Sequence, residues 1–213
     1  MKPGVIVLAA GASQRMGQPK ALLTLDGRTL LHWIVERSLA LPATEVWVTL
    51  AQPHGDRIRQ ELSSLGSRLD LQRVHVAWNE APEHGMLSSV QCALSQLNGD
   101  RSGALIWPVD LPRVQPATLL RILDAATRQP TLIVPTHDGR GGHPLWLPRA
   151  LFAEALSLPT ELGLRGLRER HPPRLVSVDD GGILRDIDTP QDWQEELQKG
   201  TTGSRTPSKP LSG

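Results

Sequence analysis

Residues 5–20 read VIVLAAGASQRMGQPK, and this stretch decides the fold. Its first six residues, Val5 to Ala10, form a continuous run of β-branched and small apolar side chains, which is typical of a strand buried in a parallel sheet. Gly11 ends the run, and a polar loop continues to Lys20. The stretch therefore predicts a central strand whose carboxyl end opens into a polar loop.

The rest of the chain alternates between helical and strand patterns. Helices are predicted at residues 29–39, 56–65, 86–97, 115–127, 149–156, 161–170 and 190–198, and further strands at 45–51, 73–78, 104–109, 131–134 and 174–178. Pro108 indicates the end of its strand or an unpaired edge, and Thr189 with Pro190 suits the start of the last helix. The alternation predicts an α/β fold, a three-layer α/β/α sandwich around a mostly parallel, Rossmann-like twisted sheet.

Composition places the chain among globular proteins, with 39% hydrophobic and 21% charged residues in 213. We expect one domain over residues 1–199 and a disordered tail at 200–213, GTTGSRTPSKPLSG. A formal net charge of +1 does not favour nucleic-acid binding. No stretch approaches the roughly 20 apolar residues of a membrane helix, and the first apolar run is too short for a signal peptide. With one cysteine, Cys92, these features predict a cytoplasmic protein without a membrane partner.

Ligands of open parallel sheets bind at the carboxyl ends of the strands. Arg15 and Lys20 lie in the loop after the first predicted strand, where a guanidinium fork and an ammonium can hold phosphate oxygens. From their spacing alone, two solvated surface cations are an equal alternative. The loop has neither a G-x-x-x-x-G-K-[ST] pattern nor a G-x-G-x-x-G pattern, which argues against a P-loop enzyme and a dinucleotide-dependent oxidoreductase.

Residues 8–20, LAAGASQRMGQPK, resemble the signature of the MobA-like nucleotidyltransferases, LAAG-x-S-x-R-M-G-x-x-K. The resemblance covers roughly residues 4–195 and is closest to the molybdenum cofactor cytidylyltransferase branch. It implies a fold of the nucleotide-diphospho-sugar transferase type and a nucleotide-binding loop that contains Leu8, Ala9, Ala10 and Gly11. Arg15 and Lys20 are then the cations that hold the triphosphate and act in catalysis.

Two aspartates in this resemblance imply a Mg²⁺ site. Asp110 belongs to a D-x-P segment after the predicted strand 104–109, and Asp188 to a D-I-D-T-P segment. A hard divalent cation prefers such carboxylate oxygens. The alternatives are a turn or helix cap for Asp110 and an N-terminal cap for Asp188. Asp186 alternates with Asp188 on a predicted strand and would share its face, so its role stays open.

Two further segments carry binding predictions. The resemblance implies that Gly85, Ser88 and Ser89 border the nucleotide, and Asn79 is placed to contact base or ribose. The alternatives are a serine-rich helix start and a plain turn residue. Residues 135–144, PTHDGRGGHP, match a pattern of the branch that modifies the molybdenum cofactor. There Gly139, Gly141 and Gly142 permit close approach of an acceptor, and Arg140 and His143 contact its phosphate, or His143 only holds the loop.

The resemblance implies transfer of CMP from CTP to a molybdopterin-type phosphorylated cofactor, with release of pyrophosphate and a molybdoenzyme as a further partner. The sequence Ala9-Ala10-Gly11 favours CTP, because the guanylyltransferase branch usually has two glycines there. Two alternatives remain: another nucleotide, such as GTP, with a different phosphorylated acceptor, and a non-catalytic maturation factor that binds nucleotide or cofactor. Retention of both cations and both predicted metal carboxylates argues against the second alternative.

Overall fold

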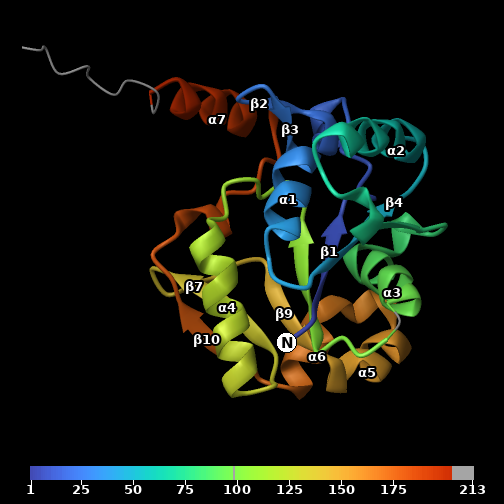
Figure 1. The fold of residues 1–213 in the computed structure, drawn as a ribbon, viewed down its shortest axis with the longest axis vertical. Helices are drawn as coiled ribbons and strands as arrows, with labels where there is room; N and C mark the ends of the chain where they lie inside the picture. The colour runs from blue at the N-terminus through green and yellow to red at the C-terminus, as the bar shows by residue number, and fades with distance from the viewer. Residues whose placement is uncertain (98, 203–213) are drawn as a thin grey trace, which may run out of the picture.

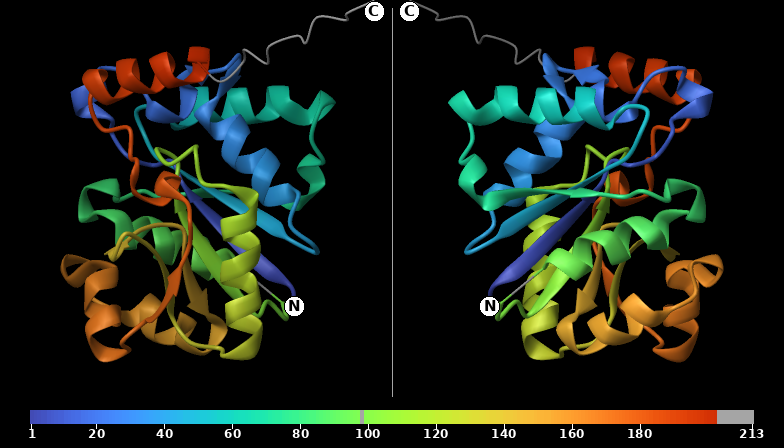
Figure 2. Two further views of the ribbon diagram at one scale, coloured as in Figure 1. Left: turned by 90° about the vertical axis from the view of Figure 1, so that its left-hand side faces the viewer. Right: turned by 90° about the vertical axis from the view of Figure 1, so that its right-hand side faces the viewer.

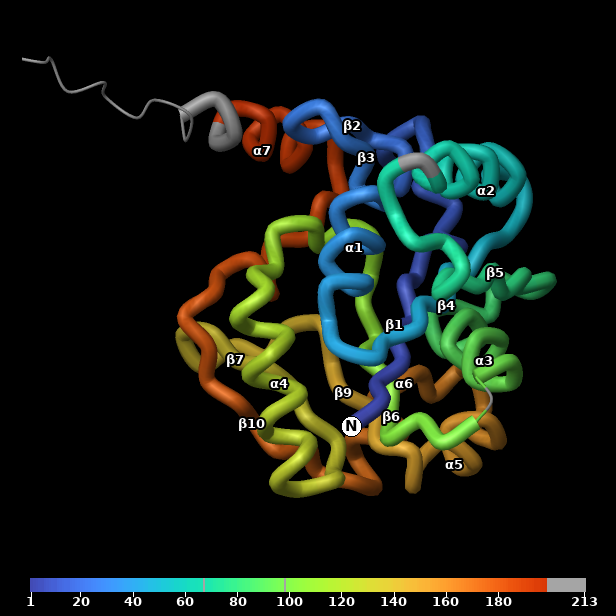
Figure 3. The backbone as a smooth tube through the Cα atoms, in the orientation of Figure 1, coloured from blue at the N-terminus to red at the C-terminus, as the bar shows by residue number. Residues whose placement is uncertain are grey.

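The computed structural model describes residues 1–97 and 99–202, and its centre is a mixed eight-stranded sheet of order β10-β7-β9-β6-β1-β4-β5, with β8 beside β7 (Figure 1). The strands of this sheet are β1 Pro3–Leu8, β4 Glu45–Leu50, β5 Val74–Trp78, β6 Gly103–Pro108, β7 Ile133–His137, β8 Arg140–Gly141, β9 Leu145–Pro148 and β10 Arg174–Ser177. β1 pairs in parallel with β4 on one side and β6 on the other, so the predicted central strand is confirmed (Figure 3).

Helices cover both faces of the sheet, which confirms the three-layer α/β/α architecture (Figure 2). They are α1 Leu30–Leu39, α2 Gly55–Ser64, α3 Met86–Gln96, α4 Pro116–Arg128, α5 Phe152–Ser157, α6 Gly163–Arg170 and α7 Pro190–Thr202. α1, α2 and α4 pack on one face, and α3, α5 and α6 on the other. Within residues 1–97 and 99–202, no helix has the length and apolar character needed to span a bilayer.

The alternation of side chains along β1 explains why a continuous apolar run forms this strand. Val5 and Val7 point into the core beneath α1, α2 and α4, whereas Ile6 points into the core beneath α3, α5 and α6. All three side chains are fully buried. A strand covered on both faces leaves no position for a polar residue until it ends, and the polar loop begins there.

The structure corrects several details of the predicted elements. Pro108 ends β6, but β6 lies between β1 and β9, so the edge interpretation is wrong. β9 runs antiparallel to β6 and β7 and was not predicted as a strand. Residues 185–188 form no strand. α7 continues to Thr202, past its predicted end, and the remaining part of the predicted tail, residues 203–213, lies outside the described residues.

Candidate functional site

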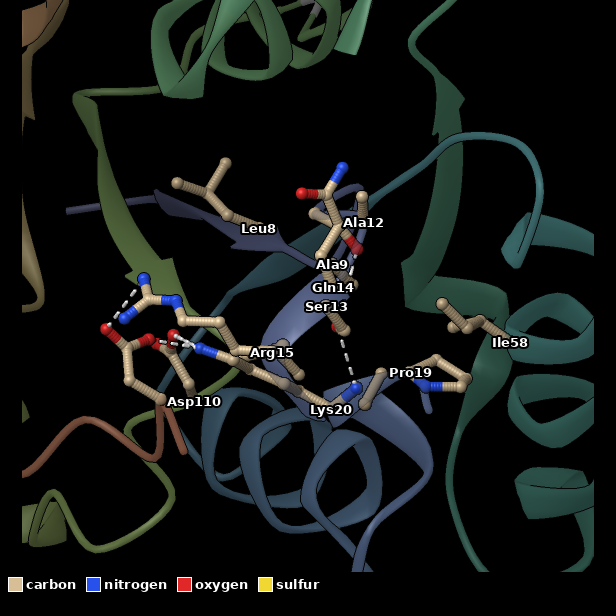
Figure 4. Close-up of a pocket in the computed structure, with 14 residues that line it drawn as sticks. Leu8, Ala9, Ala12, Ser13, Gln14, Arg15, Pro19, Lys20, Ile58 and Asp110 are labelled. Carbon is tan, nitrogen blue, oxygen red and sulfur yellow. Dashed lines mark hydrogen bonds and ion pairs between the residues drawn. The ribbon is translucent and has the colours of Figure 1, made fainter. Parts of the chain in front are cut away.

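A cavity of about 310 Å³ opens at the carboxyl ends of β1 and β6 (Figure 4). Residues of the loop that follows β1 make up most of its wall, and Ile58 of α2 closes one side. Asp110, which follows β6, and Asp188, which precedes α7, complete it. The cavity therefore lies where the parallel topology places ligand sites, and it joins segments that are far apart in the sequence.

The loop after β1 is held by its own backbone and by one serine. Ser13 and Gly17 both have left-handed backbone angles, φ 50° and 66°, on either side of a short 3₁₀ turn, Gln14–Met16. Met16 of that turn is buried, and the Lys20 N–H donates to Ser13 Oγ at 3.1 Å. This bond closes the loop and places Lys20 at the cavity wall.

The charged groups of the cavity pair with one another. Lys20 Nζ donates to Asp110 Oδ2 at 2.8 Å and also to Asp188 Oδ1, and Arg15 Nη2 lies 3.4 Å from Asp188 Oδ2 (Figure 4). Burial alone would lower the pKa of Lys20, but its ion pairs and hydrogen bonds with the two carboxylates outweigh burial and raise it. The lysine is therefore a firmly charged ammonium between two carboxylates.

Backbone hydrogen bonds bring the two aspartates together. The Ile187 N–H donates to the Asp110 carbonyl oxygen at 3.0 Å, which fixes the segment before α7 against the end of β6. Thr189 and Asp192 then form a reciprocal cap: Asp192 N–H donates to Thr189 Oγ1 at 3.2 Å, and Thr189 N–H to Asp192 Oδ2 at 2.7 Å. The predicted cap at Thr189 is confirmed, and the Asp188 side chain is left for the cavity.

The donor set around Lys20 Nζ fits a hard divalent cation. Asp110 and Asp188 offer carboxylate oxygens on either side of a position that a cation, the ammonium, occupies. Two carboxylates suffice when water and phosphate oxygens complete the shell, as is usual for Mg²⁺. In the part of the chain that the structure describes, no group of three or more acidic, histidine or cysteine side chains gathers into a metal site. Asp186 is exposed and does not line this first cavity, but it lines a neighbouring one together with the pair.

That second cavity, of about 420 Å³, shares Asp110 and Asp188 with the first. Its lining also includes Arg140, an exposed residue at the start of β8, and His143, which follows β8. Burial lowers the pKa of His143, and the charges of Asp110 and Asp186 oppose this shift only in part. The structure thus places the two predicted acceptor residues in the second cavity, whereas Arg15 and Lys20 line the first.

Gly142 lines the second cavity, and it also makes a close backbone contact that was not predicted. A Cβ atom on Gly142 would lie 2.3 Å from the Ile183 carbonyl oxygen, so its missing side chain permits close approach of this chain's own backbone. The His143 N–H donates to that same carbonyl at 3.1 Å. Gly142 therefore joins the 135–144 loop to the segment that leads to Asp188.

We expect Gly142→Ala to lower the free energy of unfolding by about 2 kcal/mol, since the added methyl group must displace backbone. It should also lower the affinity of the second cavity for any ligand that binds there. The matched control is Gly141→Ala, whose Cβ would meet a single side-chain atom, Val134 Cγ1, at 3.1 Å and no backbone atom. Chemical denaturation of both variants measures the difference, and equal stabilities would contradict the proposed close contact.

Four residues predicted to border the nucleotide form a hydrogen-bonded group at the start of α3. Asn79 Nδ2 donates to Ser88 Oγ at 2.8 Å and to Ser89 Oγ at 3.0 Å, and all three residues are buried. Ser88 Oγ donates to the Gly85 carbonyl oxygen at 2.8 Å. None of the four lines either cavity, and neither does Ala10. The network holds the turn before α3, and contact of these residues with a nucleotide stays a prediction.

Ser13 and Ile58 are cavity residues that the sequence analysis did not select. Ser13 stands inside the signature of residues 8–20, so its fixed position in the pattern was the signal that could have found it. Ile58 reads only as part of the apolar face of α2, and no local pattern distinguishes it from a core residue. Leu8, Ala9, Gly11, Arg15, Lys20, Asp110 and Asp188 line the first cavity.

Comparison with known proteins covers most of the chain. Residues 5–175 match the family model described as the MobA-like NTP transferase domain. The molybdenum cofactor cytidylyltransferase of Escherichia coli K12 is 25% identical over 188 residues, which are 88% of this chain and 92% of that protein. The bifunctional protein GlmU of Bordetella parapertussis is 35% identical over 131 residues, 58% of this chain, and the matched part is 26% of its length.

Solved structures extend the likeness to the whole fold. Rv0371c of Mycobacterium tuberculosis H37Rv is 30% identical, with a TM-score of 0.74 and coverage of 92% of this chain and 97% of that one. The structure of the same protein in complex with manganese gives 28% identity and a TM-score of 0.71, over 93% and 99% of the two chains. The loop after β1 and Asp110 lie within the residues matched by the family model, and Asp188 lies beyond them.

Proposed function

Because the chain belongs to the MobA-like NTP transferase family, we propose that it transfers CMP from CTP to a molybdopterin-type phosphorylated acceptor and releases pyrophosphate. The family supports nucleotidyltransferase activity, while the base and the acceptor are our proposal. The observation that carries it is the pair Asp110 and Asp188, which lies between two cavities and belongs to both. A transferase that joins two anionic substrates needs such an arrangement, with one substrate on each side.

The first cavity suits the nucleoside triphosphate. Arg15 and Lys20 are the two cationic side chains in its lining, and the loop of residues 8–20 forms most of its wall. Arginine holds phosphate oxygens with a planar fork and lysine with a point charge, so together they can hold the β- and γ-phosphates. Both would also stabilise the charge that accumulates on the departing pyrophosphate.

The second cavity suits the acceptor. A phosphate monoester has a second pKa of about 6 and is mostly a dianion at neutral pH, so it attacks without a general base. One of its oxygens forms a new bond to the α-phosphorus while the bond from that phosphorus to the bridging oxygen breaks, and pyrophosphate leaves with the electron pair. Arg140 would orient the acceptor phosphate by charge, and His143, whose pKa burial lowers, would do so as a neutral imidazole.

We further propose Mg²⁺ as the cofactor, held by Asp110 and Asp188. The ion would supply charge neutralisation at the phosphate oxygens that join donor and acceptor. The oxygen donor set supports this assignment, as does the manganese complex of the relative Rv0371c. With the metal bound, Lys20 would be free to turn from the carboxylates to the triphosphate.

Two observations favour CTP and molybdopterin over other substrates. The loop reads Ala9-Ala10-Gly11 rather than containing two glycines, and a relative that matches 88% of the chain is a molybdenum cofactor cytidylyltransferase. A cytidylylated cofactor would then pass to a molybdoenzyme partner. The need for a nucleoside triphosphate is consistent with the expected cytoplasmic location.

The test is pyrophosphate release from CTP, GTP, ATP and UTP in turn, with Mg²⁺ and molybdopterin, with and without molybdate. We expect release with CTP alone and loss of release when Mg²⁺ is chelated. Release with GTP alone would refute the base assignment but keep the mechanism. Release only with a phosphorylated sugar or lactate derivative would refute the acceptor. If protein that is shown to be folded releases no pyrophosphate with any acceptor, the result would favour a non-catalytic binding factor.

A further inference from the structure

Three segments that adjoin Lys20, Asp110 and Asp188 of the candidate site meet at one side chain, Arg113. This residue follows Asp110 by three positions, in the loop between β6 and α4. The first partner segment is the hairpin of β2 Thr24–Leu25 and β3 Arg28–Thr29, which follows Lys20. The second is α7, which begins just after Asp188 and lies beside that hairpin (Figures 1 and 2).

Arg113 joins these segments through two carboxylates. Its Nε donates to Glu196 Oε1 of α7, and its Nη1 donates to Asp26 Oδ2 of the hairpin at 3.3 Å. Glu196 is 5% exposed, so its charge is held almost out of water. A guanidinium can bind two separate carboxylates at once because its N–H groups point in fixed, different directions.

The backbone around Arg113 is held in place, so a displacement of its side chain would be transmitted to Asp110. Arg37 Nη1 donates to the Val114 carbonyl oxygen at 3.1 Å, and Trp107 Nε1 donates to the Leu111 carbonyl oxygen at 3.1 Å. On the other side, a Cβ on Gly182 would lie 2.5 Å from the Arg113 carbonyl oxygen. The loop that begins at Asp110 therefore has little space in which to adjust alone.

We propose that Arg113 is a positioning residue: it sets the relative placement of Lys20, Asp110 and Asp188 by tying the hairpin, the Asp110 loop and α7 to one guanidinium. The functional part of this inference rests on the proposed function. Stability alone does not account for the arrangement, because an ion pair that buries a carboxylate, as this one buries Glu196, is commonly no better than well-packed apolar side chains. Arg113 Nη2 is also buried without a hydrogen-bond partner among the described residues, which adds a cost to the fold.

The test compares Arg113→Met with Arg101→Met in the full-length protein. Arg101 also pairs with a glutamate, Glu45, and its side chain is 12% exposed, but it lies at the opposite, amino end of β6 and β4. We expect both variants to lose thermal stability. Only Arg113→Met should weaken Mn²⁺ binding, measured by electron paramagnetic resonance, by about tenfold, as losses of supporting contacts around metal ligands do.

Two further measurements separate positioning from a general structural effect. Hydrogen–deuterium exchange should rise in residues 24–29 and 186–189 of Arg113→Met and stay unchanged there in Arg101→Met. The double variant Arg113→Met/Glu196→Leu removes both charges, so it should regain stability. It should not regain Mn²⁺ affinity, because the tie between the segments is still absent.

Three results would overturn the inference: unchanged exchange in both segments of Arg113→Met, equal loss of Mn²⁺ affinity in Arg101→Met, or full recovery of Mn²⁺ affinity in the double variant. Failure of the wild-type protein to bind Mn²⁺, with or without CTP, would instead refute the proposed metal site. Hydrogen exchange would still decide the structural tie in that case, so the two failures are distinguishable.

Discussion

Asp110→Asn is expected to reduce pyrophosphate release by roughly 100-fold or more, which corresponds to about 3 kcal/mol of transition-state stabilisation. The substitution changes charge and little else. The asparagine amide oxygen can still accept the hydrogen bond that Lys20 Nζ makes with Asp110 Oδ2 at 2.8 Å. The carboxylate proposed to hold Mg²⁺ is lost, while the backbone bond from Ile187 to residue 110 does not depend on the side chain.

The measurement is steady-state pyrophosphate release, with the melting temperature recorded for each protein. Asp124→Asn is the control, because Asp124 is an exposed carboxylate paired with Arg128 on the outer surface of α4. We expect the control to have wild-type activity, and we expect both variants to melt close to the wild-type temperature. An Asp110→Asn protein with undiminished turnover would remove Asp110 from the mechanism and would leave the metal proposal without its central ligand.

The strands and the loop that form the first cavity were predictable from sequence because they follow from local rules. A strand buried on both faces shows as a continuous apolar run, and Val5 to Ala10 has that form. The loop after it is polar because it lines an open cavity at the end of the strand rather than packing in the core. The parallel topology then places Arg15, Lys20 and Asp110 at one edge of the sheet, as the structure confirms.

Features that depend on contacts between distant parts of the chain could not be predicted from the sequence in the same way. β9 is short, and all four of its residues are buried, so it has neither the length nor the alternation of a recognisable antiparallel strand. Asp186 and Asp188 are spaced as on a strand, yet backbone pairing of Ile187 with Asp110 fixes an irregular segment instead. The convergence on Arg113 joins Asp26 and Glu196, separated by 170 positions in the chain, and no local pattern marks it.

Lys20→Met, as a single substitution, is also expected to lower pyrophosphate release by a factor of roughly 100 or more relative to wild type. The reason differs from that for Asp110→Asn. Methionine fills a similar volume but carries no charge. It would leave the triphosphate with Arg15 as the one cation that lines the described first cavity. Without the ammonium, the carboxylates of Asp110 and Asp188 would face each other with only the exposed Arg15 beside Asp188 to compensate their charge, so the metal-free protein should also lose stability.

The pH dependence of that stability difference tests the cause. Lys20 has a raised pKa in the folded protein, above the ordinary value of 10.5, because its pairing with the carboxylates outweighs burial. Its stabilisation is therefore fully present below the ordinary pKa of lysine and is lost as the pH rises through the raised one. Denaturation of the wild-type protein and of Lys20→Met from pH 7 upward should show a constant difference in the free energy of unfolding, which disappears only in the strongly alkaline range.

Added Mg²⁺ or Mn²⁺ should reduce this difference, here called the gap, at pH 7, because a divalent cation can replace the missing ammonium between the carboxylates. A gap that is insensitive to both alkaline pH and metal would mean that Lys20 stabilises the fold through packing of its aliphatic stem, and the carboxylate pair would then need another explanation.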